Sequence, residues 1–527
     1  MRLAAGLRHW LIKSGDGFLL PLVILAFFWQ LGRPALFDLD EGAFSAATWE
    51  MLQRGDYITT FLNGQPRFDK PILIYWLQAM SVSLFGLQEW ALRLPSALAA
   101  SSWVIATYYF AKAYLPQRSA QLAAVMVASS AMIVLIGRAA TADALLNLLI
   151  TLSLFDIWRY WQQPSKALLW RVFVWLGLGF LTKGPVAVAI PLVVSAFLYI
   201  SQGQWRPWLQ TVFNPQGLGI FLLIVLPWYL LEYAAQGQAF IDGFFFKHNL
   251  NRFADTMEGH GGSVWYYLIA LPFIIMPFGG LLVQLLWPQR FRAANTSAPV
   301  LAKTFKRFLW FWFLAVLAFF SFSNTQLPHY VLYGITPLLV LLAHACGEQP
   351  NRWLAVIPAL LVALLLLALP ELLQLAAGSN PDPYWQGLLA QASKTTGLAY
   401  RLAAVLYVMA LALLLWWPKL TNFWRLIGVA LMQTLFFGSI LIPVIAYIQQ
   451  SPVKEAARFA RHQLPEATIV MDGVDMPSFT VYRQTVTPKR APQVGDYVFS
   501  QIGAMQPAEY YEVVFQQGGI MLARRLQ

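Results

Sequence analysis

Apolar runs long enough to cross a lipid bilayer recur through most of this 527-residue chain. A transmembrane helix needs about 20 mostly apolar residues, so the pattern predicts about thirteen spans. They are expected at 17–35, 91–114, 119–136, 144–162, 168–182, 185–202, 216–235, 265–288, 308–323, 329–346, 353–375, 399–417 and 424–447. Only 11% of the residues are charged and the mean hydropathy is +0.56, whereas about a quarter are charged in soluble proteins. The sequence therefore predicts a polytopic α-helical membrane protein.

The distribution of Lys and Arg predicts the orientation of these spans. With the N-terminus in the cytoplasm, the inside loops hold Arg118, Arg159, Lys166, Arg171, Arg206, Arg290, Arg292, Lys303, Lys306, Arg307, Arg352, Lys419 and Arg425. Cytoplasmic loops are enriched in Lys and Arg, so this orientation is favoured, and an odd number of spans places the C-terminus outside. The net charge of +12 is scattered rather than gathered in one stripe, and nucleic acid is therefore not an expected partner.

The first external loop, residues 36–90, is the most acidic part of the predicted membrane region. It holds six carboxylates between Asp38 and Asp69. Charges are costly in hydrocarbon, so these residues form either a solvated loop or a site. Segments 42–54 and 71–86 are amphipathic or apolar and are expected to lie along the membrane surface. The alternative, in which 71–86 is itself a span, would reverse every later loop.

The composition changes at about residue 448. A helix is expected from Ser451, with Pro452 at its first position. Strand-like runs follow at 467–471, 479–483, 496–502, 512–515 and 520–523. We therefore expect a membrane domain of residues 1–447 and a small α/β domain of residues 448–527 outside the membrane. The single cysteine, Cys346, excludes an internal disulfide.

Ionisable residues and one tyrosine in the predicted outer loops are the candidates for a functional site. They are Asp40, Glu41, Asp69, Lys70, Arg138, Asp143, Lys183, Lys247, His248, Arg252, His260, His329 and Tyr330. Carboxylates can act as bases, and Lys and Arg bind phosphate. Because all of these residues are predicted on one side of the membrane, we expect a single external site.

Two of the acidic motifs have structural alternatives. Asp40 and Glu41 are either a base or a helix N-terminal pair that favours the helix dipole. Arg138 and Asp143 are either site residues or a local ion pair.

The basic motifs are also ambiguous. Lys70 precedes Pro71 at an expected helix start, where a cation is unfavourable unless an anion is near; it either binds phosphate or reaches the membrane surface. Lys183 either belongs to the site or stands in a turn. Asp69 with His248 suits a divalent cation such as zinc, although two ligands are weak evidence for a metal site.

The order of these motifs resembles that of the polyprenyl-phosphate-dependent glycosyltransferases of the GT-C class. The matching segments are 39–44, 51–57, 67–71, 75–76, 141–146, 181–185, 248–253, 264–267 and 327–332. Within this class the chain is most similar to the bacterial lipid A aminoarabinose transferases, which are related to protein O-mannosyltransferases. The resemblance implies a multi-pass protein of the bacterial inner membrane with a periplasmic active site. It also implies inverting transfer of a sugar from undecaprenyl phosphate to lipid A.

The resemblance also implies roles for individual residues. It implies that Asp40 and Asp143 serve catalysis, that Lys70, Arg252 and Tyr330 lie at the donor phosphate, and that Asp69 and His248 hold a metal. From the residues themselves, Glu41 is expected to join Asp40 in catalysis, and Lys183, Arg138 and His260 are expected to form an additional site. No cofactor is required, but a zinc or magnesium ion is compatible. The chain departs from the family at Asp69, where Glu is usual, and from the aminoarabinose branch at Gln326 and Lys247.

Other functions compete with lipid A modification. A transferase of the same class could move a different sugar to another envelope glycan or to protein. A lipid-linked sugar flippase is disfavoured because such transporters often show repeated halves and ionisable residues at mid-membrane depth. A scaffold would not need ordered acidic and basic motifs. Since an outward-facing site has no access to cytoplasmic nucleotide sugars, a lipid-linked donor is expected.

Overall fold

Long helices dominate the computed structural model, which describes residues 16–251, 263–287, 301–347, 350–379, 382–505 and 508–527. Each of the thirteen apolar runs predicted from the sequence is represented by helix. These helices are α2 (Leu19–Phe27), α5 (Glu89–Tyr114), α6 (Gln117–Ser129), α7 (Ala131–Arg138), α8 (Asp143–Gln162), α9 (Lys166–Lys183), α10 (Val186–Ile200), α12 (Pro215–Gln236), α15 (Tyr266–Ile274), α16 (Leu282–Leu286), α18 (Lys303–Ser321), α19 (Ile335–Cys346), α20 (Arg352–Leu367), α21 (Leu369–Ser379), α23 (Leu398–Trp416), α24 (Asn422–Phe436) and α25 (Ile442–Gln449).

Fewer of the described helices are long and apolar enough to cross a membrane than there are predicted apolar runs. Five helices in the described ranges are long and apolar enough to span a bilayer, or eight if each of three bent helix pairs is one span. The pair α6 and α7 bends by 57°, and the pair formed by α15 and the 279–286 helix bends by 120° at a break that contains Pro277. One predicted span, α10, has 15 residues and is about 22 Å long, which is shorter than a hydrocarbon core of about 30 Å. Because not every predicted span is long enough by this measure, the count of thirteen stays a prediction.

The loop of residues 36–90, which the sequence predicts to be the first external loop and which keeps that name here, folds into two helices joined by a hairpin. Helix α3 (Asp40–Arg54) is followed by strands β1 (Phe61–Leu62) and β2 (Gln65–Pro66) and then by α4 (Leu73–Phe85). Asn63 and Gly64 connect the strands with positive φ angles of 54° and 81°, as a two-residue hairpin of this kind requires. With 13 residues, α4 is about 20 Å long, too short for a hydrocarbon core of about 30 Å. This length disfavours the alternative in which 71–86 is a span, and the topology stays a prediction.

The C-terminal region forms a four-stranded mixed sheet with two helices. Its order is β3 (Ile469–Met471), β4 (Tyr497–Gln501), β6 (Ile520–Arg525) and β5 (Tyr511–Gln517), with only the β3–β4 pair parallel. Helix α26 (Ser451–Gln463) begins as predicted. The strand expected at 479–483 is instead α27 (Ser478–Arg483). Its β-branched and aromatic residues favour a strand locally, but packing overrides this preference, since the Phe479 ring stacks on Phe499 at 4.1 Å.

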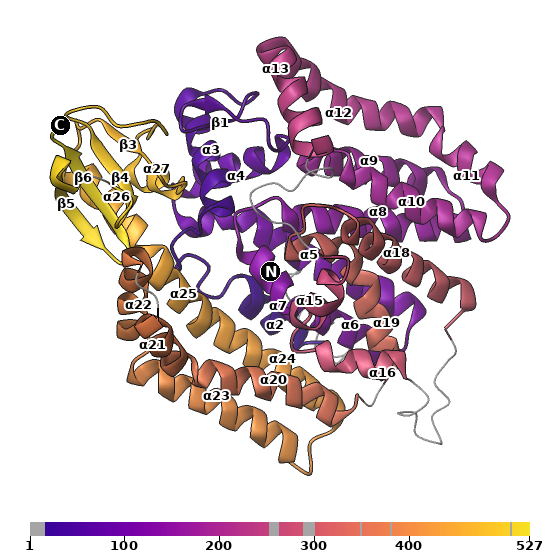
Figure 1. Cartoon of the computed structure of the whole chain (residues 1–527). Helices are drawn as coiled ribbons and strands as arrows, with labels where there is room; N and C mark the ends of the chain where they lie inside the picture. Colours follow the sequence, from indigo (N-terminus) through magenta and orange to yellow (C-terminus); the bar gives the residue numbers. More distant parts are fainter. Residues whose placement is uncertain (1–15, 252–262, 288–300, 348–349, 380–381, 506–507) are drawn as a thin grey trace.

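Helix α27 connects this C-terminal region to the first external loop. In Figure 1 the helix lies between the yellow strands and indigo α3. The backbone N–H of Ser478 donates a hydrogen bond to the Asp38 carboxylate at 2.9 Å, and its hydroxyl donates another. The Tyr482 hydroxyl accepts from the backbone N–H of Leu36 at 2.7 Å. The segment 36–41 is therefore held from outside by residues more than 400 positions away in the chain.

Candidate active site

A cavity of about 300 Å³ opens between the first external loop and the ends of several long helices. Asp38, Asp40 and Glu41 line it from the loop, and we call these residues the loop side. Across the cavity, Asp143 and His329 line it from helix ends. With Lys183 and Tyr333, which contact Asp143, they form what we call the helix side. The structure thus brings together six of the predicted site residues, which are Asp40, Glu41, Asp143, Lys183, His329 and the cavity-lining Arg138.

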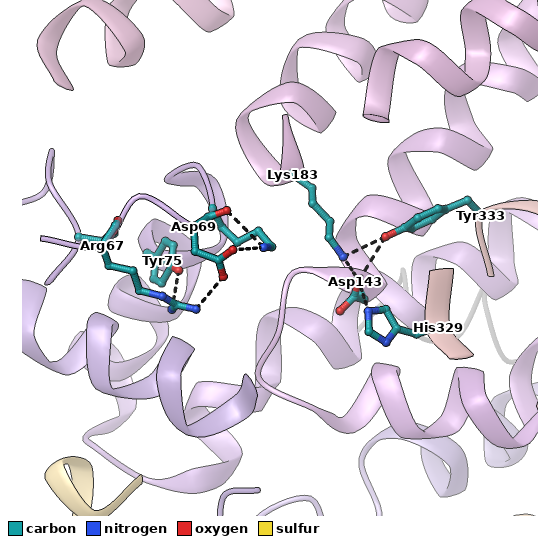
Figure 2. Close-up of polar contacts among 9 residues, drawn as sticks. Arg67, Asp69, Tyr75, Asp143, Lys183, His329 and Tyr333 are labelled. Carbon is teal, nitrogen blue, oxygen red and sulfur yellow. Dashed lines mark hydrogen bonds and ion pairs between the residues drawn. The ribbon is translucent and has the colours of Figure 1, made fainter. Parts of the chain in front are cut away.

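The helix side is a compact network of mutually paired groups (Figure 2). The Lys183 ammonium donates to Asp143 Oδ1 at 2.6 Å and to the Tyr333 hydroxyl at 3.0 Å. The Tyr333 hydroxyl lies 3.4 Å from the same carboxylate oxygen, and His329 Nε2 lies 3.9 Å from it. Both members of the ion pair are largely buried, with 11% and 12% of their side chains exposed.

Helix ends bring this pair together. Asp143 stands in the first turn of α8, where the dipole favours a carboxylate, and Lys183 is the last residue of α9, where it favours a cation. Gly184 ends α9 with a φ of 77°, and a Cβ there would lie 2.8 Å from the Phe244 ring. The turn predicted at 183–185 is therefore present. Lys183 both stands at this turn and belongs to the site, so the two alternatives for this residue are both met.

Arg138 does not form the local ion pair with Asp143 that the sequence suggested. Its guanidinium donates to the carbonyl oxygens of Ala26 at 3.1 Å and Trp29 at 2.6 Å. The local pairing is wrong because Arg138 ends α7 and points toward the end of α2, while Lys183 takes the carboxylate. Arg138 therefore joins α2 to α7 beneath the cavity that it lines.

Glu41 is fully used by the protein itself. Its two oxygens accept from Arg93 at 2.7 and 2.8 Å, and from the backbone N–H groups of Phe37 and Ala140, both at 2.8 Å. These four hydrogen bonds saturate a carboxylate, which has about four acceptor sites. The side chains of Glu41 and Arg93 are each 3% exposed. This geometry suits a group that positions the loop.

Asp40 differs from Glu41 both in its exposure and in its hydrogen bonds. It is an exposed residue at the start of α3. No side chain or N–H group in the described ranges donates a hydrogen bond to its carboxylate, although Arg67 and His329 interact with it electrostatically. Of the carboxylates that line the cavity, Asp40 is therefore the one that accepts no described hydrogen bond at either oxygen.

Asp38 completes the loop side and was not predicted as a site residue. Burial raises the pKa of its carboxyl to about 7, against the lowering effect of its hydrogen bonds from Ser478. The negative charges of Asp475 and Glu41 add to the increase. Asp38 is thus a carboxyl that changes its charge near neutral pH, at the contact between the loop and the C-terminal region.

A second ion-pair network lies beside the helix side (Figure 2). Asp69 accepts from Lys70 at 2.6 Å and from Arg67 at 3.0 Å, and Arg67 also donates to the Tyr75 hydroxyl at 3.0 Å. Lys70 interacts electrostatically with Asp143. Two cations thus stand next to the cavity with one carboxylate between them, an arrangement that suits an anion.

The predicted metal site is not supported by this arrangement. Asp69 is already paired with two cations, which disfavour a metal ion beside them. The described residues contain no group of three His, Cys, Asp or Glu side chains able to hold a metal. The side chain of His248, in the π-helix Ile241–Asn251, lies outside the described residues. Metal binding by Asp69 and His248 stays a prediction.

The remaining predicted phosphate ligands are only partly described. Arg252 and His260 lie outside the described residues. Tyr330 is buried in the 3₁₀-helix Pro328–Gly334, and its ring packs edge-on against His329 with centroids 4.8 Å apart. The Lys183 ammonium lies 5.3 Å from the centre of the Tyr330 ring. This places Tyr330 beside the helix side, and its role in phosphate binding stays a prediction.

Sequence reasoning missed Tyr333 and Arg67. A 3₁₀-helix has three residues per turn, so Tyr333 lies on the same face as Tyr330, and recognising that helix would have found it. Arg67 was noticed within a motif, but its buried position between Asp69 and Tyr75 depends on how α4 packs.

Comparisons with known proteins identify the family. Residues 69–230 match the family model described as dolichyl-phosphate-mannose-protein mannosyltransferase. The undecaprenyl phosphate-α-4-amino-4-deoxy-L-arabinose arabinosyl transferase of Yersinia pestis is 29% identical over 348 residues, which are 64% of this chain and 60% of the relative. An uncharacterized protein of Aquifex aeolicus is 30% identical over 359 residues, which are 67% of this chain and 78% of that relative.

A solved structure extends the likeness to the fold. The crystal structure of ArnT from Cupriavidus metallidurans bound to undecaprenyl phosphate superposes with a TM-score of 0.78 over 98% of both chains, at 19% identity. The chain belongs to the GT-C, aminoarabinose transferase-like family. In sequence, it spans about 60% of the length of its Yersinia relatives. The resemblance stated from the motifs is confirmed at the level of the family.

Proposed function

We propose that this protein is a membrane glycosyltransferase that moves a sugar from undecaprenyl phosphate to an acceptor outside the membrane, with lipid A as the acceptor. The main support is the first cavity, which is lined by Asp40 and by Asp143 of the largely buried Asp143–Lys183 pair. The cations Lys70 and Arg67 lie in the neighbouring ion-pair network. The name of the Yersinia relatives and the carrier lipid in the Cupriavidus structure support this choice of donor.

The reaction is an inverting displacement. The acceptor oxygen forms a bond to the anomeric carbon while the bond from that carbon to the carrier phosphate oxygen breaks, and undecaprenyl phosphate leaves with the electron pair. Asp40 orients the acceptor and takes its proton where the acceptor is a hydroxyl. Lys70 and Arg67 stabilise the negative charge that develops on the departing phosphate. Arg252 would add a third cation.

The helix side is assigned to the sugar. A sugar hydroxyl or amino group can donate a hydrogen bond to Asp143 Oδ2, because the described contacts with Lys183 and Tyr333 are both made by Oδ1. Glu41 is assigned a positioning role through Arg93 and the backbone of 37 and 140. No step is assigned to a metal ion.

The proposed orientation places this cavity on the periplasmic face of the bacterial inner membrane. The N-terminus is then cytoplasmic and the C-terminal region periplasmic, as the Lys and Arg distribution favours. In this position the lipid carrier supplies the activated sugar, because nucleotide sugars remain in the cytoplasm.

A second candidate is transfer of a different sugar to another envelope glycan or to protein. The chain differs from the aminoarabinose branch at Gln326 and Lys247, and these differences favour a sugar or an acceptor other than those of that branch. Gln326 is buried and donates to the backbone carbonyls of Ser321 and Ser323 at 3.0 and 3.2 Å, so it holds the segment before His329 and adds no cation to the cavity.

Mass spectrometry of envelope lipids and glycans tests the acceptor. A deletion strain is compared with strains complemented by wild type or by Asp40→Asn. We expect one sugar to be missing from lipid A in the deletion strain and to return only with wild type. An unchanged lipid A, with a sugar missing from another glycan or protein, would reject lipid A and support the second candidate.

A further inference from the structure

A second cavity lies where the C-terminal region meets the start of α5. Its volume is about 470 Å³. Helix α26 lines it with Lys454, Arg458, Arg461 and His462, and the start of α5 adds Glu89. It shares Leu36 and Tyr482 with the contact between loop and C-terminal region, but none of the residues that line the first cavity.

The charges on this cavity are predominantly basic. Lys454, Arg458 and Arg461 follow the spacing i, i+4 and i+7, so they stand on one face of α26. Lys454 forms an ion pair with Glu89, and Arg458 forms one with Glu455 on the exposed surface of the helix. Like charges at this spacing destabilise a helix unless an anion offsets them. Three cations thus border the cavity against one lining carboxylate.

Arg461 and His462 keep all of their described side-chain donors for a ligand. Both are exposed, and within the described ranges neither forms a hydrogen bond or an ion pair with another side chain. Arg458 donates to Glu455 from Nη1. Its remaining N–H groups and the Arg461 guanidinium offer the donors that match a phosphate.

Apolar side chains continue from the mouth of this cavity. At the end of α4, Leu84 is 69% exposed and Phe85 is 46% exposed. The next residues, Leu87 and Gln88, line the cavity itself. An anion that carries acyl chains would contact both surfaces, whereas a free anion would contact only the basic one.

We propose that this second cavity binds the phosphate group of a phosphate-bearing lipid, with Arg458 and Arg461 as its main ligands and the end of α4 against its acyl chains. The proposal does not depend on the transfer reaction, because binding is measured without a sugar donor. A lipid held here would rest against Glu89 and Tyr482, and so against the contact that holds segment 36–41.

The test is a titration of the purified full-length protein in detergent by native mass spectrometry, with dioctanoyl phosphatidic acid as the probe. Dioctanoyl phosphatidylcholine and inorganic phosphate are the comparison ligands. The test variant is Arg458→Gln with Arg461→Gln. Its matched control is Lys394→Gln with Arg524→Gln, which removes two exposed cations outside both cavities. Lys70→Ala separates binding in the first cavity.

We expect the test variant to bind phosphatidic acid about tenfold more weakly than wild type, while the control variant and Lys70→Ala retain this binding. Phosphatidylcholine and inorganic phosphate should bind more weakly than phosphatidic acid. Unchanged affinity in the test variant would overturn the site. Inorganic phosphate binding as tightly as the lipid would overturn the lipid part, since the cavity would then take a free anion.

Discussion

The two sides of the first cavity satisfy their charges in opposite ways. On the helix side, Asp143, Lys183 and Tyr333 pair with one another inside the protein. On the loop side, Glu41 is saturated by distant groups, and Asp40, the residue directly before it, has no hydrogen-bond donor within the described ranges. The two adjacent carboxylates therefore have different uses.

This difference fits the proposed division of roles, in which Asp40 activates the acceptor and the helix side binds the sugar. A carboxylate without donors can accept a proton from a substrate, whereas a carboxylate paired with a cation is a weaker base because the cation stabilises its ionised form. Loop-side geometry depends on contacts with α27 and Arg93, while helix-side geometry depends on two helix ends. Substitutions on the two sides should therefore fail in different ways.

The largest effect is expected at Asp40. Asp40→Asn should lower the transfer rate about a thousandfold, because an amide cannot accept the acceptor proton. Its melting temperature should stay close to that of wild type, since the side chain accepts no described hydrogen bond. Single-turnover kinetics with a saturating lipid-linked donor measures the rate. Full activity in a folded Asp40→Asn protein would reject the assignment.

Substitution of the neighbouring Glu41 should instead lower the stability of the folded protein. Glu41→Gln places an amide N–H group against Arg93 and the backbone N–H groups that Glu41 now accepts from, so stability should fall by about 3 kcal/mol. Thermal unfolding in detergent, read by tryptophan fluorescence, measures this loss. A normal melting temperature with abolished activity would show that Glu41 is catalytic after all.

A double-mutant cycle examines the helix side. Asp143→Asn and Lys183→Met should each weaken transfer, and the double variant should lose less than the sum, with a coupling of about 1 to 2 kcal/mol. The reason is that either single change leaves a buried partner uncompensated. The cycle is measured through kcat/KM. Strict additivity would mean that the ion pair contributes nothing to the site.

The smallest effect concerns pH and Asp38. Its pKa is raised by burial to about 7, so the folded state retains a proton that the unfolded state releases near 3.8. The stability from this proton is complete below that lower pKa and is lost as pH rises through about 7.

Asp38→Asn keeps acceptor and donor groups for Ser478 but cannot ionise. Between pH 5 and pH 8, the melting temperature of wild type should therefore fall by about 2 °C more than that of Asp38→Asn. Calorimetry of both proteins at the two pH values measures the difference. Parallel curves would contradict the shifted pKa, because all other titrating groups are shared.

Much of the fold follows from the sequence, because apolar runs and helix-end residues act locally. Breaks such as the 57° bend between α6 and α7 do not, since packing decides them. The helical state of Ser478–Arg483 was also missed, because its β-branched residues favour a strand until Phe479 packs on Phe499.

The site was predictable in its members more than in its pairings. The sequence placed Asp143 and Lys183 among the site candidates, but the one pairing it offered for Asp143, as an alternative, was with nearby Arg138. The Glu41–Arg93 pair joins residues 52 positions apart, and the Asp38–Ser478 contact joins residues 440 apart. Such partners are set by the packing of whole elements, which no local pattern reports.

The most direct test of the account follows the donor lipid itself. Purified protein in vesicles is given a labelled sugar on undecaprenyl phosphate together with lipid A, and the products are separated by mass spectrometry. We predict labelled lipid A and an equal amount of free undecaprenyl phosphate, both lost with Asp40→Asn. Movement of the intact labelled donor across the vesicle, without release of undecaprenyl phosphate, would contradict the account and identify a flippase.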